Sequence, residues 1–274
     1  MDRDILVKIF EKLNVIDVTM GASRVCISLG SLPLTKNLFG KPSTSQISNA
    51  WTSAILDYQT PGSTVPINLF FNYDTYLTDE DLIIAAQRMP NIRKLVLPRW
   101  CHLSENSYQF AFRQWGNLQT LIIDQRHSSL TWRHMIQASG ENCINLTNFK
   151  IMGCINEVVA EEIVRCFPNL KKLSLRFCDI IDISNVLPLI TNLKNLTILN
   201  LAHCRFLHEG SGYLICSHEL ENLLNEIARY KCETSIRLCL NVDCKFCENT
   251  YGIARVHAFF EKNWRNDEIE EFDF

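Results

Sequence analysis

The sequence predicts an α/β solenoid, in which short parallel strands alternate with helices along a curved stack. Two observations lead to this prediction. Five segments with the same apolar pattern recur at nearly constant spacing, and the stretches between them have the apolar periodicity and capping residues of helices. Repetition at an interval of this length is typical of proteins in which each unit packs mainly against its neighbours.

The recurring segments each place Asn before an apolar pattern of the form Leu-x-x-Leu-x-Leu. They cover residues 91–97, 117–123, 145–151, 169–175 and 195–201. Their first apolar residues are 26, 28, 24 and 26 positions apart. The leucine-rich repeat has this pattern and a period of about 20–29 residues. Because Leu-x-Leu alternates with a period of two, we expect each segment to form a short strand that buries one face.

Two weaker units extend the array at its ends. Residues 64–69 look like a degenerate first repeat, and residues 236–240 look like a final strand. Terminal units of solenoids are usually atypical because they cap the core. We therefore expect roughly six or seven units, forming a leucine-rich-repeat domain over residues 64–260.

Helices are predicted between the strands. Thr78 precedes Asp81 with the spacing of a capping box, and Ser104 can cap the helix that carries Tyr108. Thr131 can cap a helix that starts at Trp132. Further helices are expected at residues 157–166, 187–193 and 219–230.

Three cysteines follow repeat segments at the same place, in the turn after the strand. They are Cys154, Cys178 and Cys204. A small, weakly polar side chain suits a buried turn, so we interpret them as packed structural thiols. Near the end of the chain, Cys244 and Cys247 have zinc-ligand spacing and His257 lies nearby. We favour a packed last repeat there, with zinc as the minor alternative.

Composition and motifs exclude several classes of function. A formal net charge of -3 gives no general attraction to nucleic acid or to a membrane surface. The chain lacks a phosphate-binding glycine loop, a nucleophile elbow and a paired metal-ligand motif. We expect a binding protein rather than an enzyme, with no catalytic residue, no cofactor and no metal, located in the nucleus or cytoplasm.

The repeat and both ends of the chain resemble plant F-box/leucine-rich-repeat proteins of the cysteine-containing type. Residues 1–13 form a candidate amphipathic helix, and residues 15–18 and 22–26 follow in the order of an F-box. Residues 239–247 are similar to the tail of these proteins. Two positions depart from the F-box pattern, since Met1-Asp2 replaces Leu-Pro and Leu29-Gly30 replaces Trp-Arg.

The resemblance implies a domain order and a set of partners. Residues 1–40 would be an incomplete F-box-like helical segment, 41–63 a connection and 261–274 an acidic tail after the repeats. The F-box would bind a Skp1-type adaptor and through it a cullin, while the repeats bind an unknown target protein. The alternative is an adaptor-free leucine-rich-repeat scaffold. The expected adaptor-binding residues are Ile5, Leu6, Ile9, Leu13, Val18, Val25 and Cys26.

Side chains that alternate with the buried leucines should face away from the core. The apolar ones among them, Val96, Ile122 and Ile198, suggest a face partly covered by a partner. Basic residues on neighbouring units could bind an acidic segment, although an ordinary solvated face is the alternative. The candidate partner-binding residues are Lys150, Lys172, Ser174 and Arg176.

Overall fold

The computed structural model describes residues 55–58, 66–71, 76–98, 100–101, 103–124, 131–208 and 235–237. Within these ranges the main sheet has eight strands in the order β1-β2-β4-β6-β7-β9-β11-β13. The first pair, β1 and β2, is antiparallel, and every later neighbour is parallel. The strands are β1 (Ile55–Tyr58), β2 (Pro66–Phe70), β4 (Lys94–Val96), β6 (Thr120–Asp124), β7 (Asn148–Met152), β9 (Lys172–Ser174), β11 (Ile198–Asn200) and β13 (Ser235–Arg237).

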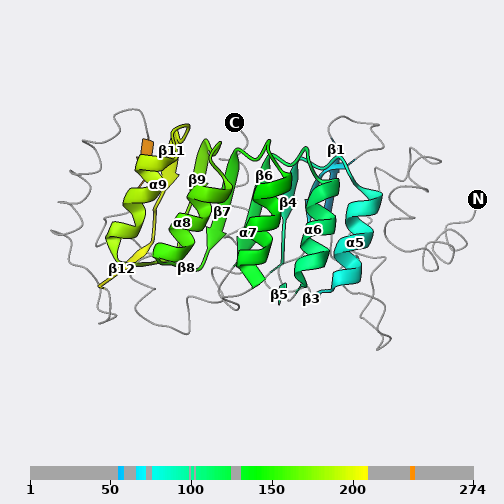
Figure 1. Cartoon of the computed structure of the whole chain (residues 1–274), viewed down its shortest axis with the longest axis horizontal. Helices are drawn as coiled ribbons and strands as arrows, with labels where there is room; N and C mark the ends of the chain where they lie inside the picture. The colour runs from blue at the N-terminus through cyan, green and yellow to red at the C-terminus, as the bar shows by residue number, and fades with distance from the viewer. Residues whose placement is uncertain are drawn as a thin grey trace, which may run out of the picture.

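A layer of helices covers one face of this sheet. Figure 1 shows α5 to α9 side by side in front of the strands, each next to the helix of the following unit. The helices are α5 (Asp79–Arg88), α6 (Glu105–Gln114), α7 (Thr131–Asn142), α8 (Glu157–Cys166) and α9 (Val186–Asn192), the last preceded by a 3-10 turn, η3 (Ile183–Asn185). The arrangement confirms the predicted leucine-rich-repeat solenoid. Among the described residues, no helix has the length and apolar character needed to cross a membrane.

The expected helix caps are confirmed at two helices. The Thr78 hydroxyl accepts a hydrogen bond from the backbone N–H of Asp81 at 3.3 Å and donates to the Asp81 carboxylate at 2.7 Å. The Ser104 hydroxyl likewise accepts from the backbone N–H of Ser107 at 3.3 Å. Helix α7 begins at Thr131 itself, one residue earlier than the sequence pattern predicted.

The core lies between the sheet and the helices. One residue from each main strand after β1 points toward the helices, and the parallel register places these residues in a single row. Leu173 and Leu199 in this row are both 0% exposed, which confirms the predicted repeat register. The row consists of Leu69, Leu95, Leu121, Phe149, Leu173, Leu199 and Ile236.

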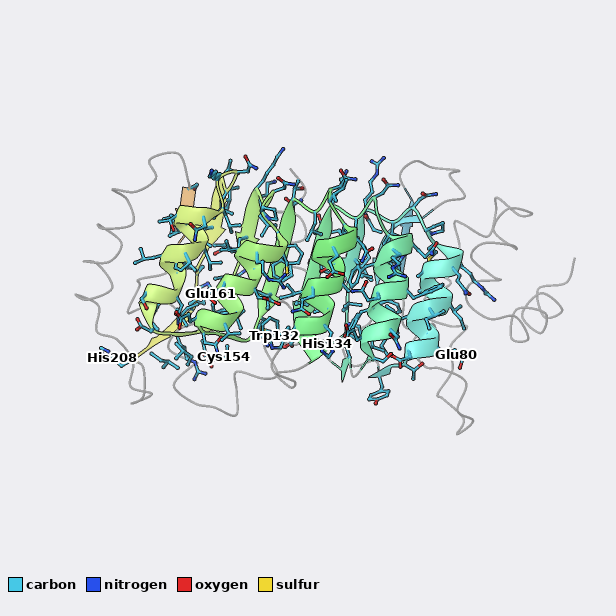
Figure 2. All side chains as sticks on the ribbon, in the orientation of Figure 1. Glu80, Trp132, His134, Cys154, Glu161 and His208 are labelled. Atoms are coloured by element: carbon cyan, nitrogen blue, oxygen red, sulfur yellow. The ribbon has the colours of Figure 1, made fainter. Side chains whose placement is uncertain are left out.

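Short strands pair along the edge of the sheet where the helices begin. Two form β3 (Tyr76–Leu77) with β5 (Trp100–Cys101), and three form the parallel order β12-β10-β8. Their bounds are Cys154–Ile155 for β8, Asp179–Ile181 for β10 and Arg205–Leu207 for β12. Figure 2 shows Cys154 on this edge, together with Glu80, His134 and His208.

The buried turn position predicted for Cys154 is wrong. Cys154 is exposed and pairs across the short sheet with Asp179, the residue after Cys178. The backbone carbonyl of Gly153 accepts from Asp179, as the carbonyl of Cys178 accepts from Arg205, so Gly153 takes the structural place of the turn cysteine. This turn is one residue shorter than the next two, and the shift brings Cys154 to the surface so that Ile155 can be buried.

Candidate protein-binding face

The sheet face opposite the helices, called the strand face below, carries two further rows of side chains. The register aligns them across the sheet because parallel neighbours pair without a shift between β2 and β13. One row contains Asn68, Lys94, Thr120, Asn148, Lys172, Ile198 and Ser235. The other contains Phe70, Val96, Ile122, Lys150, Ser174 and Asn200.

The first half of the strand face, from β2 to β7, contains a buried apolar cluster next to polar and charged side chains. Val96, Ile122 and Met152 form a cluster separate from the main core and are only 0%, 1% and 2% exposed. Phe70 packs against this cluster, and so does Phe177 from the turn after β9. The Lys94 ammonium lies 5.9 Å from the centre of the Phe70 ring. A cation over an aromatic face is attracted by the ring's negative surface, so the lysine can be tolerated in an apolar setting. Around the cluster, Asn68, Phe70 and Asn148 are half-buried.

The second half, formed by β9, β11 and the turns that follow them, has a different character. Two polar side chains on its strands are buried, since Ser174 is 0% and Asn200 is 4% exposed. Lys172 and Ile198, paired across these two strands, are half-buried. The half-buried side chains of Arg176, Phe177 and His203 follow in the turns.

The side chains of Arg176, Phe177 and His203 contact one another in the turns after β9 and β11. The Arg176 guanidinium lies 4.7 Å from the centre of the Phe177 ring. On that ring, the His203 imidazole stacks at 4.9 Å with an angle of 18° between the planes. Near-parallel stacking of flat groups is a favourable arrangement for aromatic rings and for guanidinium. The stack joins two consecutive repeats at the rim of the strand face.

Both rings are held on an unusual backbone. Phe177 has φ of 66° and His203 has φ of 60°, in the left-handed region that bulky residues rarely adopt. Each precedes a turn cysteine that donates a hydrogen bond to the previous unit, from Cys178 to the Ile151 carbonyl at 3.2 Å and from Cys204 to the Leu175 carbonyl at 2.9 Å. These anchors fix the turn and help to maintain the strained residue before the cysteine.

The positive charge on the strand face of the second half comes from Lys172 and Arg176. Burial, reinforced by the nearby positive charge of Arg176, lowers the pKa of His203 to about 4. His203 is therefore neutral near pH 7 and contributes a flat aromatic surface. The Asp179 carboxylate accepts a hydrogen bond from Arg205 at 2.6 Å, so these two opposite charges compensate one another.

The candidate partner-binding residues divide between buried and accessible positions. Lys150 is 1% and Ser174 is 0% exposed, whereas Lys172 and Arg176 are half-buried on the rim side. The candidate residues predicted from the sequence do not include Phe177 or His203. A signal was present, because both residues stand immediately before a repeat-turn cysteine, 26 positions apart.

The predicted adaptor-binding residues lie outside the described residues. This applies to Ile5, Leu6, Ile9, Leu13, Val18, Val25 and Cys26. The cysteines of the C-terminal segment, the helix expected at residues 219–230 and the acidic tail also lie outside them. Their roles remain predictions.

The chain is similar to known plant proteins along almost its whole length. It is 35% identical to an F-box protein of Arabidopsis thaliana over 325 aligned positions, which cover 100% of this chain and 95% of that protein. The chain belongs to the plant F-box protein family. An F-box/leucine-rich-repeat protein of the same plant is 27% identical, with 98% of this chain and 94% of that protein covered. Family membership indicates a role in substrate recognition for ubiquitin ligases. No family model matches the chain.

Solved structures of other repeat proteins are also similar to the chain. Human trophoblast glycoprotein matches 56% of this chain and 51% of its own, with 18% identity and a TM-score of 0.33. A structure of the Drosophila Toll–Spatzle complex matches 66% of this chain and 24% of its own, with 12% identity and a TM-score of 0.38.

Proposed function

We propose that this protein is the substrate-recognition subunit of a Skp1–cullin–F-box ubiquitin ligase. Its N-terminal segment binds a Skp1-type adaptor, and its repeats bind the target protein. The supporting observation is the match to F-box proteins along the whole chain, because it includes the N-terminal segment as well as the repeats. The subunit itself performs no chemistry and raises the effective concentration of the target near the ligase. We place it in the nucleus or cytoplasm.

The strand face supplies the target-binding part of this proposal. Solenoids commonly bind partners on the extended surface formed by their strands, because every repeat contributes side chains to it. The half-buried stack of Arg176, Phe177 and His203 supports this assignment. Arg and aromatic side chains are the types most enriched at the centre of protein interfaces.

A second candidate function is an adaptor-free repeat scaffold. The sequence favours it at two places, where Met1-Asp2 and Leu29-Gly30 replace Leu-Pro and Trp-Arg of the F-box pattern. Pro suits the first turn of a helix because its φ is preset and it lacks an unsatisfied N–H. Truncating a buried aromatic typically costs about 3–5 kcal/mol, and less where Leu partly fills the space.

A titration of purified adaptor against the full tagged chain separates the two functions. We expect binding that strengthens at least tenfold, or about 1.4 kcal/mol, in a variant that combines Met1→Leu, Asp2→Pro, Leu29→Trp and Gly30→Arg. An Ile9→Asp variant, which places a charge on the apolar helix face, should lose binding. If neither the natural chain nor the restored variant binds adaptor, the ligase function is wrong and the scaffold function replaces it.

A further inference from the structure

The two edges of the solenoid carry opposite charges. Its helices all run in one direction, because each connects two parallel strands of the main sheet. Where the helices begin, exposed acids such as Glu80, Glu105 and Glu157 lie in the first turns, and Figure 2 labels Glu80 on this side. Where the helices end and the main strands begin, exposed cations lie on what we call the basic edge. They are Arg93, Arg113, Lys171 and Lys194.

Hydrogen bonds between backbones arrange this edge as a regular row. The residue before each main strand accepts an N–H from its equivalent in the next unit, as the Arg93 carbonyl does from Gln119 at 2.8 Å and the Lys171 carbonyl from Thr197 at 2.8 Å. The row consists of Arg93, Gln119, Thr147, Lys171 and Thr197. Four steps at the ~4.8 Å spacing of neighbouring strands make it about 19 Å long.

The charge of the basic edge is largely uncompensated. Among the described residues of this edge, Glu141 is the one exposed acid, and it accepts a hydrogen bond from Gln109 at 2.9 Å. Helix C-termini favour cations, which accounts for Arg113 in the last turn of α6. Arg93 and Lys171 instead stand directly before strands, so the helix ends do not explain them.

An apolar side chain stands in the middle of the basic edge. Ile144 is 73% exposed and lies in a turn in which the Leu146 N–H donates to the Cys143 carbonyl at 3.0 Å. The same turn in other units holds Gly116, Pro168 or Lys194 at this place, residues that suit an exposed turn. The unit of Ile144 lies between the units of the four cations in the sheet order. The edge therefore combines a central apolar contact with cations on both sides.

The chain contains a segment with the complementary pattern. Residues 266–274, called the tail segment below, read Asn-Asp-Glu-Ile-Glu-Glu-Phe-Asp-Phe, so that acids alternate with the apolar residues Ile269, Phe272 and Phe274. Extended at ~3.3 Å per residue, a segment of this length spans about 26 Å, which is enough to follow the whole row. Residues 238–265 connect it to β13, and a connection of that length can reach any point of the edge.

We propose that the tail segment binds in extended form along the basic edge of its own chain. Its carboxylates bind the four cations, and an apolar side chain of the segment packs on Ile144. Attachment to the same chain gives the segment a high effective concentration, so individually weak contacts are sufficient. The bound segment closes the basic edge to other acidic ligands. This inference is independent of the proposed ligase function.

Zero-length cross-linking of the full chain with a carbodiimide tests the contact, because this reagent joins carboxylates to lysine amines that already touch. We expect peptide mass spectrometry to find Lys171 and Lys194 joined to acids of the tail segment. The yield should fall several-fold between about 50 and 500 mM salt, because salt screens exposed charges. If the tail segment cross-links only to other lysines, or to none, the proposal is wrong.

Variants that retain both reactive lysines locate the contact. Arg113→Gln should lower the cross-link yield at least threefold, and its combination with Arg93→Gln at least tenfold. Ile144→Ser should lower it several-fold and leave the salt dependence unchanged. The matched control is Arg133→Gln, which removes an exposed arginine from the neighbouring helix α7 and should stay within twofold. Thermal melts confirm that each variant is folded. An equal loss for Arg133→Gln and Arg113→Gln would reduce the effect to overall charge and overturn the proposed site.

Two further measurements identify the occupant. In an equal mixture of isotope-labelled and unlabelled chains, the cross-linked peptides should contain no mixed pairs, since mixed pairs would mean that a second copy supplies the segment. A labelled peptide of residues 266–274 should bind a full chain whose tail acids are replaced by Asn and Gln, and should bind the natural chain at least tenfold more weakly. Fluorescence anisotropy measures both affinities. Equal affinities, or no binding to the variant, contradict occupation of the edge by the chain's own segment.

Discussion

The two halves of the strand face are built on the same repeat and differ in what they expose. Toward the helices both halves have the same buried apolar row, with Leu121 and Leu199 each 0% exposed. Away from the helices, the first half has the buried cluster of Val96 and Ile122, and the second has the half-buried Phe177, which packs against that cluster and stacks on His203. The repeat motif therefore specifies the inner row, which points toward the helices. The outer rows, which lie on the strand face, can differ between units of one solenoid.

The largest expected effect contrasts the outer rows of the two halves. Val96→Asp places a carboxylate in an apolar cluster where the side chain is 0% exposed, and an uncompensated buried charge costs about 3–5 kcal/mol. Ile198→Asp places the same group at a half-buried position beside Lys172 and should cost less than about 1 kcal/mol. Urea unfolding of both variants measures the difference. Similar costs at the two sites would remove the distinction between the halves.

The inner row should show no such contrast. Leu121→Ala and Leu199→Ala each remove a side chain that is 0% exposed in the main core, so each should cost on the order of 2–5 kcal/mol. Because both lie in the same row of the repeat, we expect their losses to agree within about 1 kcal/mol, which is inside the spread of such substitutions. Urea unfolding of both variants measures the two losses, provided that the dependence of the unfolding free energy on urea concentration stays the same as in the natural chain. A much smaller loss for Leu199→Ala would mean that the second half is loosely packed throughout.

A third prediction concerns the junction between the halves, where α7 packs on α8. A Cβ added to Gly140 would lie 2.6 Å from Cys166 Cβ and 2.7 Å from the Cys166 carbonyl oxygen. Gly140→Ala must therefore push the two helices apart, at a cost of about 1–3 kcal/mol. Gly116→Ala is the matched control, since its new Cβ would come no closer than 3.8 Å to the Asn142 oxygen. If Gly140→Ala melts at the same temperature as this control, the helices at the junction are not in tight contact.

The sequence predicted the repeated elements well because their signals are local. Apolar spacing and capping residues determine short strands and helix starts within a few positions, as at Thr78 and Ser104. The position of Cys154 was not predictable from the same motif, because the turn is one residue shorter there and the buried position passes to Gly153. The placement of a turn residue depends on pairing with the next unit, about 25 residues later.

The candidate site was predicted only in part, for a physical reason. Alternation along β9 correctly placed Lys172 on the strand face, because a strand side chain has only two faces to choose from, whereas Arg176 lies in the turn after the strand. Alternation carries no information on how far each side chain is buried on that face, and Lys150 is 1% exposed. The stack of Phe177 on His203 depends on left-handed backbone in two turns, which no local propensity of Phe or His favours.

The smallest expected effect is a pH dependence specific to the second half. The pKa of His203 falls from 6.5 to about 4 on folding, because the ring is partly desolvated and lies near the positive charge of Arg176. The unfolded chain therefore takes up this proton at a higher pH than the folded chain does. The free energy of unfolding is fully retained above pH 6.5 and falls as the pH drops toward 4, by about 1 kcal/mol after allowance for solvent screening at this half-buried site. His203→Asn should remove this pH dependence of the free energy of unfolding, since Asn does not titrate and tolerates left-handed backbone. Urea midpoints of the natural chain and of His203→Asn between pH 4 and 7 measure this effect. An identical pH profile for the natural chain and His203→Asn would show that stacking on Phe177 does not hold the imidazole neutral.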